Sequence, residues 1–183
     1  MATASPRTPV IAGAVRAPAA LRRQPLWPLA ALLAGTLAAL WLVLRLPAAV
    51  ALLEPLTALT AAATAHMLAV LGLPVARELN VLTHAGGFGY EIDVACTALV
   101  PAALLTAAIL PWRRPWLARF GLAAGGIVWL ALVNQLRLVS LMVVGVYAPA
   151  GFDVLHQWLW PALLALAAAG YFCSRGVARP GSG

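Results

Sequence analysis

Residues 120–148, FGLAAGGIVWLALVNQLRLVSLMVVGVYA, form one apolar run with a single charged side chain, that of Arg137. A helix needs about 20 apolar residues to cross the roughly 30 Å hydrocarbon core, so this run is long enough to cross with a tilt. A guanidinium inside such a run costs at least about 2.5 kcal/mol, which makes Arg137 a candidate functional residue. The alternative is a structural arginine, satisfied by carbonyl groups or paired with Glu91, Asp93 or Asp153.

The composition extends this interpretation to all 183 residues, of which 63% are hydrophobic and 9% are charged. Soluble domains carry about 25% charged residues, so the composition excludes that class and predicts an all-α integral membrane protein. A net charge of +7 would suggest nucleic acid binding in a soluble protein. Here most arginines flank apolar runs, which indicates membrane orientation and no nucleic acid partner.

The chain divides into a single transmembrane helical domain over residues 26–174 and two short tails. Residues 1–25 are basic and poor in apolar side chains, so we expect a disordered cytoplasmic tail. Residues 175–183 form a short tail that we also place in the cytoplasm. The domain holds apolar runs at residues 26–44, 56–73, 94–110, 120–148 and about 155–173.

The positions of the arginines choose between two topologies. If all five runs crossed, the loop with Arg113, Arg114 and Arg119 would face away from the basic N-terminus, against the positive-inside rule. If residues 56–73 lie on the outer surface or re-enter it, every arginine cluster is cytoplasmic. We therefore expect a small bundle of about four transmembrane helices plus an interfacial or re-entrant helix. Alternating Tyr90, Ile92 and Val94 add a short extended piece near the interface.

In the four-crossing topology the helix at residues 94–110 begins at the outer face with Cys96. Asp93 precedes the cysteine by three positions and is a candidate N-cap. A helix N-terminus and a nearby guanidinium both favour the thiolate, so we expect an activated nucleophile. The alternative is a small thiol that only packs in a membrane helix.

A similar pattern begins the last run, where Asp153 precedes His156 by three positions. The histidine is a candidate base, its alternative being an interfacial polar residue, and the aspartate is a candidate N-cap that could orient the ring. Asn134 and Ser140 share roughly one helix face with Arg137 and could support it, or could serve in helix packing.

Other polar side chains give weaker signals. His66 and His84 lack the close spacing of metal ligands, so we predict no metal and no cofactor. Cys173 is expected at the cytoplasmic end, on the other side of the membrane from Cys96, so no disulfide between them is expected. It is predicted to pack or to accept an acyl chain.

Four stretches together resemble the exosortase/archaeosortase family of membrane transpeptidases. They are LGLPV at 71–75, VACTAL at 94–99, NQLRL at 134–138 and His156, within a likeness that covers roughly residues 56–172. The resemblance implies an outer-face site in which Cys96 attacks a substrate carbonyl, His156 handles protons and Arg137 stabilises the anionic intermediate or the thiolate. Thr97-Ala98 stands where the family commonly has Ser-Gly, which leaves the subfamily open.

The family also implies a partner: the C-terminal sorting signal of an exported protein, made of a short motif, a transmembrane helix and a basic tail. We therefore expect a multi-pass protein of the inner (plasma) membrane, in contact with lipid, whose thioester intermediate is resolved by an amine or by water. The short chain is either a minimal form or one that works as an oligomer or with a partner subunit. Two rival hypotheses are a non-catalytic membrane protein that uses Arg137 for helix assembly or substrate binding, and an inactive relative that binds sorting-signal helices.

Overall fold

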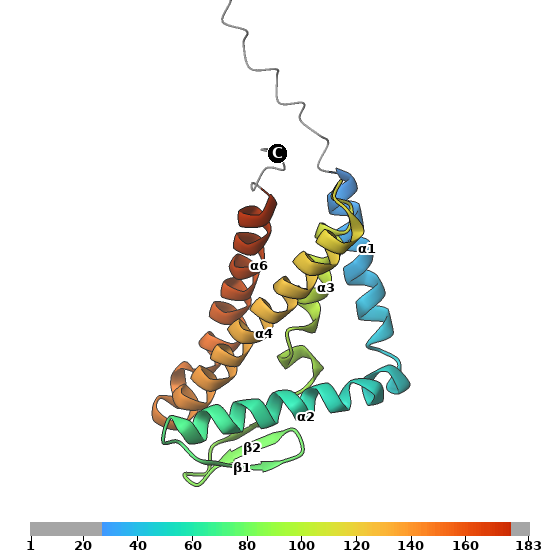
Figure 1. Ribbon diagram of the computed structural model, residues 1–183. Coiled ribbons are helices and arrows are strands. Elements are labelled where there is room, and N and C mark those ends of the chain that lie inside the picture. Colours follow the sequence, from blue (N-terminus) through green and yellow to red (C-terminus); the bar gives the residue numbers. More distant parts are fainter. Residues whose placement is uncertain (1–26, 177–183) are drawn as a thin grey trace, which may run out of the picture.

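The computed structural model describes residues 27–176, which are mostly helical (Figure 1). The expected tail at residues 1–25 lies outside the described residues, and so do residues 177–183 of the expected C-terminal tail. The elements in chain order are α1 (Trp27–Val43), α2 (Pro47–Val70), β1 (Val75–Glu78), β2 (Val81–His84), β3 (Gly89–Glu91), η1 (Val94–Cys96), α3 (Leu99–Ile109), α4 (Trp116–Tyr147), η2 (Pro149–Gly151), α5 (Phe152–Val154), η3 (Leu155–Leu159) and α6 (Trp160–Gly176).

The helices α1, α3, α4 and α6 extend between the two ends of the molecule, and α2 lies across them at one end (Figure 1). The short α3 is central, because it packs against α1, α4 and α6, and α4 also packs against α6. The start of α1 and the end of α6 both lie at the end far from α2 (Figure 1). The apolar side chains on the outward faces of these helices suit contact with lipid.

By length and composition, two helices within residues 27–176 could cross a membrane: α2 with 24 residues and α4 with 32. Because α2 lies crosswise to α4 in Figure 1, the two helices cannot both follow the membrane normal. The helix α2 packs on the sheet and on α4 through a buried face of threonines, Thr57, Thr60 and Thr64. The arrangement therefore agrees with the interfacial position expected for residues 56–73.

The start of α2 differs from the sequence-based expectation. The apolar run expected at residues 56–73 starts just after Pro55, but Pro55 lies inside a helix that already begins at Pro47. Proline removes one backbone donor from a helix. The hydroxyl of Thr57 donates to the Glu54 carbonyl (2.9 Å) next to the proline, and Thr60 donates to Leu56 (2.7 Å). The helix thus continues through a position that usually ends one.

The all-α prediction is wrong for residues 75–91, which form a three-stranded antiparallel sheet in the order β1-β2-β3. A two-residue turn joins β1 to β2, since Glu78 pairs with Val81. Leu79 adopts a positive φ of 54° in this turn. Such short strands carry little periodicity, and only the piece around Tyr90 was expected to be extended. Ile92 is buried after β3, and Val94 already belongs to η1.

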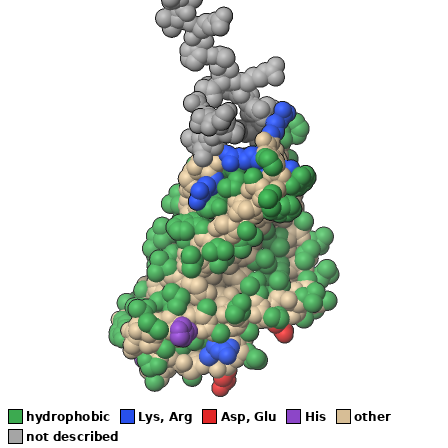
Figure 2. All heavy atoms as spheres, in the orientation of Figure 1, with side chains coloured by type: hydrophobic (Ala, Val, Ile, Leu, Met, Phe, Trp, Pro, Cys, Tyr) green, Lys and Arg blue, Asp and Glu red, His purple; other side chains and the backbone are tan. Residues whose placement is uncertain are grey.

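Charged side chains lie mainly at the two ends of the molecule (Figure 2). Arginines gather at the end where the described chain begins and ends, whereas the α2 end shows acidic side chains, a histidine and a smaller basic patch (Figure 2). The guanidinium of Arg119 lies 3.6 Å from the ring centroid of Trp116, as expected for an aromatic and basic interfacial belt. Apolar side chains cover much of the surface between the two ends (Figure 2).

Candidate functional site

Cys96 lies in η1, at the end of the bundle that α2 and the sheet cover. Two side chains fix its backbone. The Asp93 carboxylate accepts a hydrogen bond from the Cys96 amide (2.8 Å), and the Asn134 amide donates one to the Cys96 carbonyl (2.9 Å). Asp93 is therefore a cap, as expected, and Asn134 supports the cysteine, where it was expected to support Arg137. The thiol is 8% exposed and joins the core between α2, the sheet and α4.

The expected activation of Cys96 by a helix N-terminus is wrong, because η1 ends at Cys96 and α3 begins only at Leu99. Burial and the Asp93 carboxylate raise the pKa of the Cys96 thiol to about 11, although Arg137 acts in the opposite direction. The expectation took account of the helix and the guanidinium, but not of burial or of a carboxylate that also touches the cysteine. In this structure Cys96 is a protonated thiol at neutral pH.

Arg137 is buried in the middle of α4, with 6% of its surface exposed. Its guanidinium forms no ion pair and no hydrogen bond with any residue in the described range 27–176, and its Nε is a buried donor without a partner. The pairing with Glu91, Asp93 or Asp153 that the alternative interpretation of Arg137 required is therefore not present among these residues. Leaving a buried charged donor unpaired is costly, and residues 27–176 supply no anionic or carbonyl group that pairs with this one.

Ser140 supports the backbone next to Arg137. Its hydroxyl donates to the Arg137 carbonyl (2.8 Å) and accepts a hydrogen bond from the Trp160 indole (2.9 Å). Trp160 is the first residue of α6, so this chain of bonds ties the start of α6 to the turn of α4 that carries the arginine. The support is indirect, through backbone and helix position.

His156 lies in the π-turn η3, just outside α6, and stacks on Phe152 with 5.6 Å between ring centroids. Phe152 also contacts Phe88 (5.3 Å) and Tyr90 (6.3 Å) from the sheet region. Burial and Arg137 lower the pKa of His156, although Asp93 and Asp153 act in the opposite direction. The imidazole is therefore neutral at pH 7, as a general base must be.

Asp153 does not cap the helix that carries His156. It lies inside α5, whose N-cap is Gly151 without a side-chain bond, and it is exposed. The chain turns into helix through the proline-containing η2, so the helical turns begin before the aspartate. Its remaining effect on His156 is electrostatic.

A sequence model of transmembrane exosortases matches residues 9–173 of this chain. The chain belongs to the transmembrane exosortase family. No curated protein and no solved structure is similar enough to give a match. Family membership establishes a membrane protein and agrees with the resemblance seen in the sequence. The charge of Arg137 lowers the pKa of both Cys96 and His156, so the three predicted site residues of this exosortase lie near one another.

A groove lies between α3 and α6 beside the candidate site. Its cavity measures about 440 Å³ and is almost entirely apolar. Arg137 stands in its wall together with Ala95 and Thr97, the two neighbours of the cysteine. The groove is otherwise lined by α3 and α6, namely by Val100, Pro101, Leu104, Pro161, Leu164, Ala165 and Ala168.

Sequence reasoning missed Tyr90 as a member of the site and noticed it only as part of an alternating pattern. Its hydroxyl donates to the Leu138 carbonyl (2.8 Å), next to Arg137, and burial and Cys96 raise the pKa of the phenol. Phe88 was missed as well, although it packs against the Gly145 backbone of α4. Contacts between a sheet and a helix about 50 residues away in the sequence leave no local pattern that could have revealed them.

The other polar candidates lie apart from this neighbourhood. His66 is exposed on α2, and the Nδ1 atom of His84 accepts a hydrogen bond from the Gly86 amide (3.0 Å) within its own turn. Cys173 is exposed near the end of α6 and is not bonded to Cys96.

Proposed function

We propose that this exosortase is a membrane cysteine transpeptidase or protease that cleaves the C-terminal sorting signals of exported proteins. The observation that carries the proposal is Arg137, a buried guanidinium that has no partner among residues 27–176 and acts electrostatically on a thiol and an imidazole. A structural arginine would have found carbonyl or carboxylate partners. A guanidinium kept free suits a negative charge that exists only during a reaction.

The proposal includes four crossings, by α1, α3, α4 and α6, with the site on the outer face of the inner (plasma) membrane. The support is the arrangement of the helices and the gathering of arginines at the end opposite α2 (Figure 2). A tilted α4 is long enough to cross fully, whereas α3 alone spans about 16 Å, so the proposed crossing by residues 94–110 also includes η1 and the residues that join it to α3. Cysteines placed at Glu78 and Arg113 in a Cys173→Ser background test this topology. Only the former should react with an impermeant thiol reagent on intact cells.

Each step of the proposed reaction has a residue to perform it. The sulfur of Cys96 attacks the scissile carbonyl carbon while His156 accepts the thiol proton. Arg137 donates hydrogen bonds to the oxyanion that forms. Collapse breaks the peptide bond, His156 returns its proton to the leaving amine, and a thioester remains on Cys96. An acceptor amine then completes a transpeptidation, or water completes a hydrolysis.

The pKa directions favour a neutral pair before the reaction. A raised thiol pKa and a lowered imidazole pKa keep the proton on sulfur in the absence of substrate. Proton transfer therefore accompanies the attack, and a stable thiolate and imidazolium pair is not required. This mode protects the buried cysteine from oxidation and from unwanted nucleophilic reactions.

The groove between α3 and α6 gives the substrate helix a place to lie. Its small side chains, Ala95, Ala165 and Ala168, permit a close approach of another helix in lipid. A sorting-signal helix along this groove would bring the peptide that precedes it beside Arg137.

The test compares cells that carry Cys96→Ser with cells that carry the matched substitution Cys173→Ser. Mass spectrometry of the C-terminal peptides of exported and membrane proteins is the readout. The Cys96 variant should accumulate proteins that retain an apolar helix and a basic tail, and the Cys173 variant should resemble the wild type. Identical C-termini in all three strains would refute the proposal and favour a non-catalytic role for Arg137.

A further inference from the structure

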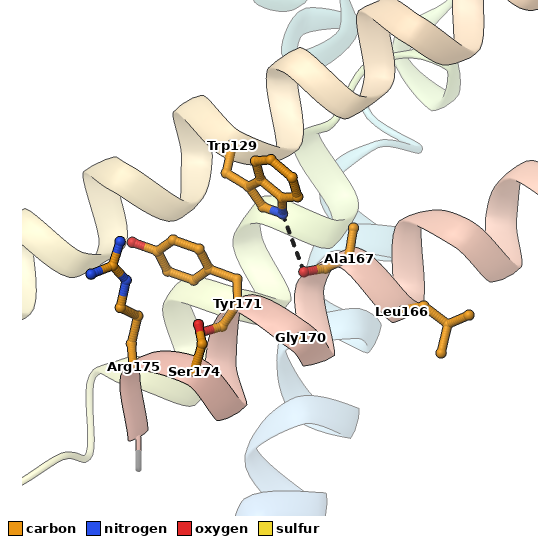
Figure 3. A pocket seen from close by; sticks show the side chains of 7 residues that line it. All are labelled: Trp129, Leu166, Ala167, Gly170, Tyr171, Ser174 and Arg175. Carbon is orange, nitrogen blue, oxygen red and sulfur yellow. Dashed lines mark hydrogen bonds between the residues drawn. The ribbon is translucent and has the colours of Figure 1, made fainter. Parts of the chain in front are cut away.

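A second cavity of about 590 Å³ lies between α4 and α6, toward the basic end of the molecule and away from the candidate active site. Figure 3 shows the side chains that line it: Trp129 from α4, and Leu166, Ala167, Gly170, Tyr171, Ser174 and Arg175 from α6. The polar groups of Ser174 and Arg175 lie toward one end, and Leu166 lies at the other (Figure 3). The cavity is thus amphipathic along its length.

The polar end carries positive charge. The guanidinium of Arg175 lies 5.6 Å from the Tyr171 ring centroid and makes no hydrogen bond or ion pair with residues 27–176. Arg114, in the loop between α3 and α4, lies at the same end of the cavity, since its Nη2 donates a hydrogen bond to the Arg175 carbonyl (3.1 Å). All five acidic residues of the chain belong to α2, the sheet region or α5. Neither α4 nor α6 carries an acidic side chain that would compete with a bound anion for the arginine.

The walls of the cavity are rigid. The Trp129 indole donates to the Ala167 carbonyl (3.3 Å), and the Tyr171 hydroxyl donates to the Leu122 carbonyl (2.8 Å), so both aromatic side chains are held across the α4–α6 contact. Gly125 and Gly126 permit this contact, since a Cβ at Gly125 would lie 2.7 Å from the Tyr171 hydroxyl oxygen. The cavity between α4 and α6 is therefore a fixed feature of the packing.

We propose that this cavity binds one anionic glycerophospholipid from the leaflet at the basic end of the protein. Its phosphate would lie against Arg175 and Ser174, and its acyl chains would follow Ala167 and Leu166 toward the hydrocarbon core. The charge of the site and its position beside the aromatic and basic belt select an anionic headgroup, and the apolar half selects a lipid over a free phosphate. The bound lipid links α4, which carries Arg137, to α6, which follows His156.

Gly170 allows a specific test, because it lines the cavity between α4 and α6 and has open space where a side chain would begin. A Cβ at Gly170 meets no atom within 4 Å, and the same holds for Gly121 on α4, which does not line the cavity. Gly170→Leu is therefore the blocking variant, and Gly121→Leu is its matched control. Arg175→Gln removes the charge in the site, and Arg113→Gln removes an exposed charge near the same end.

The experiment is native mass spectrometry of the purified full-length chain titrated with phosphatidylglycerol or phosphatidylcholine. The wild type should retain phosphatidylglycerol preferentially. Arg175→Gln should reduce its occupancy about fivefold, the loss expected when one basic residue near a lipid surface is removed. Gly170→Leu should reduce the occupancy about as much, because its side chain fills the cavity. Both control variants should match the wild type, and inorganic phosphate should not compete with the lipid.

Three results would overturn the proposal. One is an equal loss for Arg113→Gln and Arg175→Gln, which would show diffuse attraction between charges. Another is unchanged binding after Gly170→Leu. The third is the absence of any preference for phosphatidylglycerol. If Gly170→Leu fails to fold, the comparison of the two arginine variants decides alone.

Discussion

Gly145 on α4 is the position where one added methyl group should disturb the candidate site without changing any of its chemical groups. A Cβ at this position would overlap the ring of Phe88, and even the farthest of the three affected ring atoms, Cδ1, would lie only 2.6 Å away. Ordinary contact begins at about 3.4 Å, and the nearest ring atoms lie closer still than Cδ1, so the ring has to retreat by more than 1 Å. Phe88 contacts Phe152, which stacks on His156, so the displacement reaches the imidazole.

The expected magnitude follows from two opposing effects. Overpacking a well-packed core costs about 1 to 3 kcal/mol, and replacing a helical glycine by alanine returns up to about 1 kcal/mol. Gly121→Ala in the same helix is the matched control, because its added Cβ meets no atom within 4 Å. This variant therefore has only the stabilising effect of replacing a helical glycine by alanine. Gly145→Ala should therefore have a free energy of unfolding about 1 to 3 kcal/mol below that of Gly121→Ala. A misplacement of about 1 Å at a catalytic base lowers the rate by up to about 100-fold.

Two assays measure these effects. Thermal unfolding in detergent compares the two alanine variants, and the fraction of exported proteins with processed C-termini compares their activities in cells. Gly145→Ala should melt below Gly121→Ala and leave most substrates unprocessed. If the two variants had equal melting temperatures and processed equal fractions of their substrates, a displacement of Phe88 would not reach His156, and the packing argument would be wrong.

Three further predictions concern the charges and the groove of the site. Asp93→Asn should lower the pKa of Cys96 from about 11 but leave it above 9.0, because burial, the larger cause, remains; alkylation rate against pH in a Cys173→Ser background measures the shift. Glu91→Gln, a neighbouring carboxylate that does not affect the thiol, should leave the profile unchanged, and an equal shift would contradict the assignment. Processing should decline as pH falls through the lowered pKa of His156, since a protonated imidazole cannot accept the thiol proton; a decline already complete at pH 7 would contradict this. Ala165→Trp should fill the groove between α3 and α6 and reduce processing at least tenfold, whereas Leu163→Trp, outside the groove on the same helix, should have little effect; equal activity of the two variants would exclude the groove as the substrate path.

Much of the architecture was predictable because membrane insertion leaves strong signals in sequence. The basic residues around Arg113 favoured a non-crossing helix at residues 56–73, and α2 does lie across the bundle (Figure 1). The sheet was less accessible, since strands of three or four residues carry almost no periodicity. The helix through Pro55 was missed because α2 packs on the sheet and on α4, a tertiary effect that a local propensity rule does not weigh.

The candidate site shows a similar division. The cap by Asp93 was predicted from spacing and is present, because a cap involves residues three positions apart. The state of Cys96 was not predicted, because its burial depends on α2, the sheet and α4 together. Likewise, only the folded chain reveals that Arg137 lacks a partner and that Asn134 holds the cysteine carbonyl.

The most direct test of the proposed function is chemical capture of the thioester on Cys96. Membranes from the wild type, Cys173→Ser and Cys96→Ala would be treated with hydroxylamine, which releases a thioester-bound protein as a C-terminal hydroxamate that mass spectrometry identifies. The proposal predicts hydroxamate-terminated exported proteins from the wild type and from Cys173→Ser, and none from Cys96→Ala. If the same hydroxamates appeared from Cys96→Ala, or if none appeared from a wild type that processes its substrates, Cys96 would not be the nucleophile.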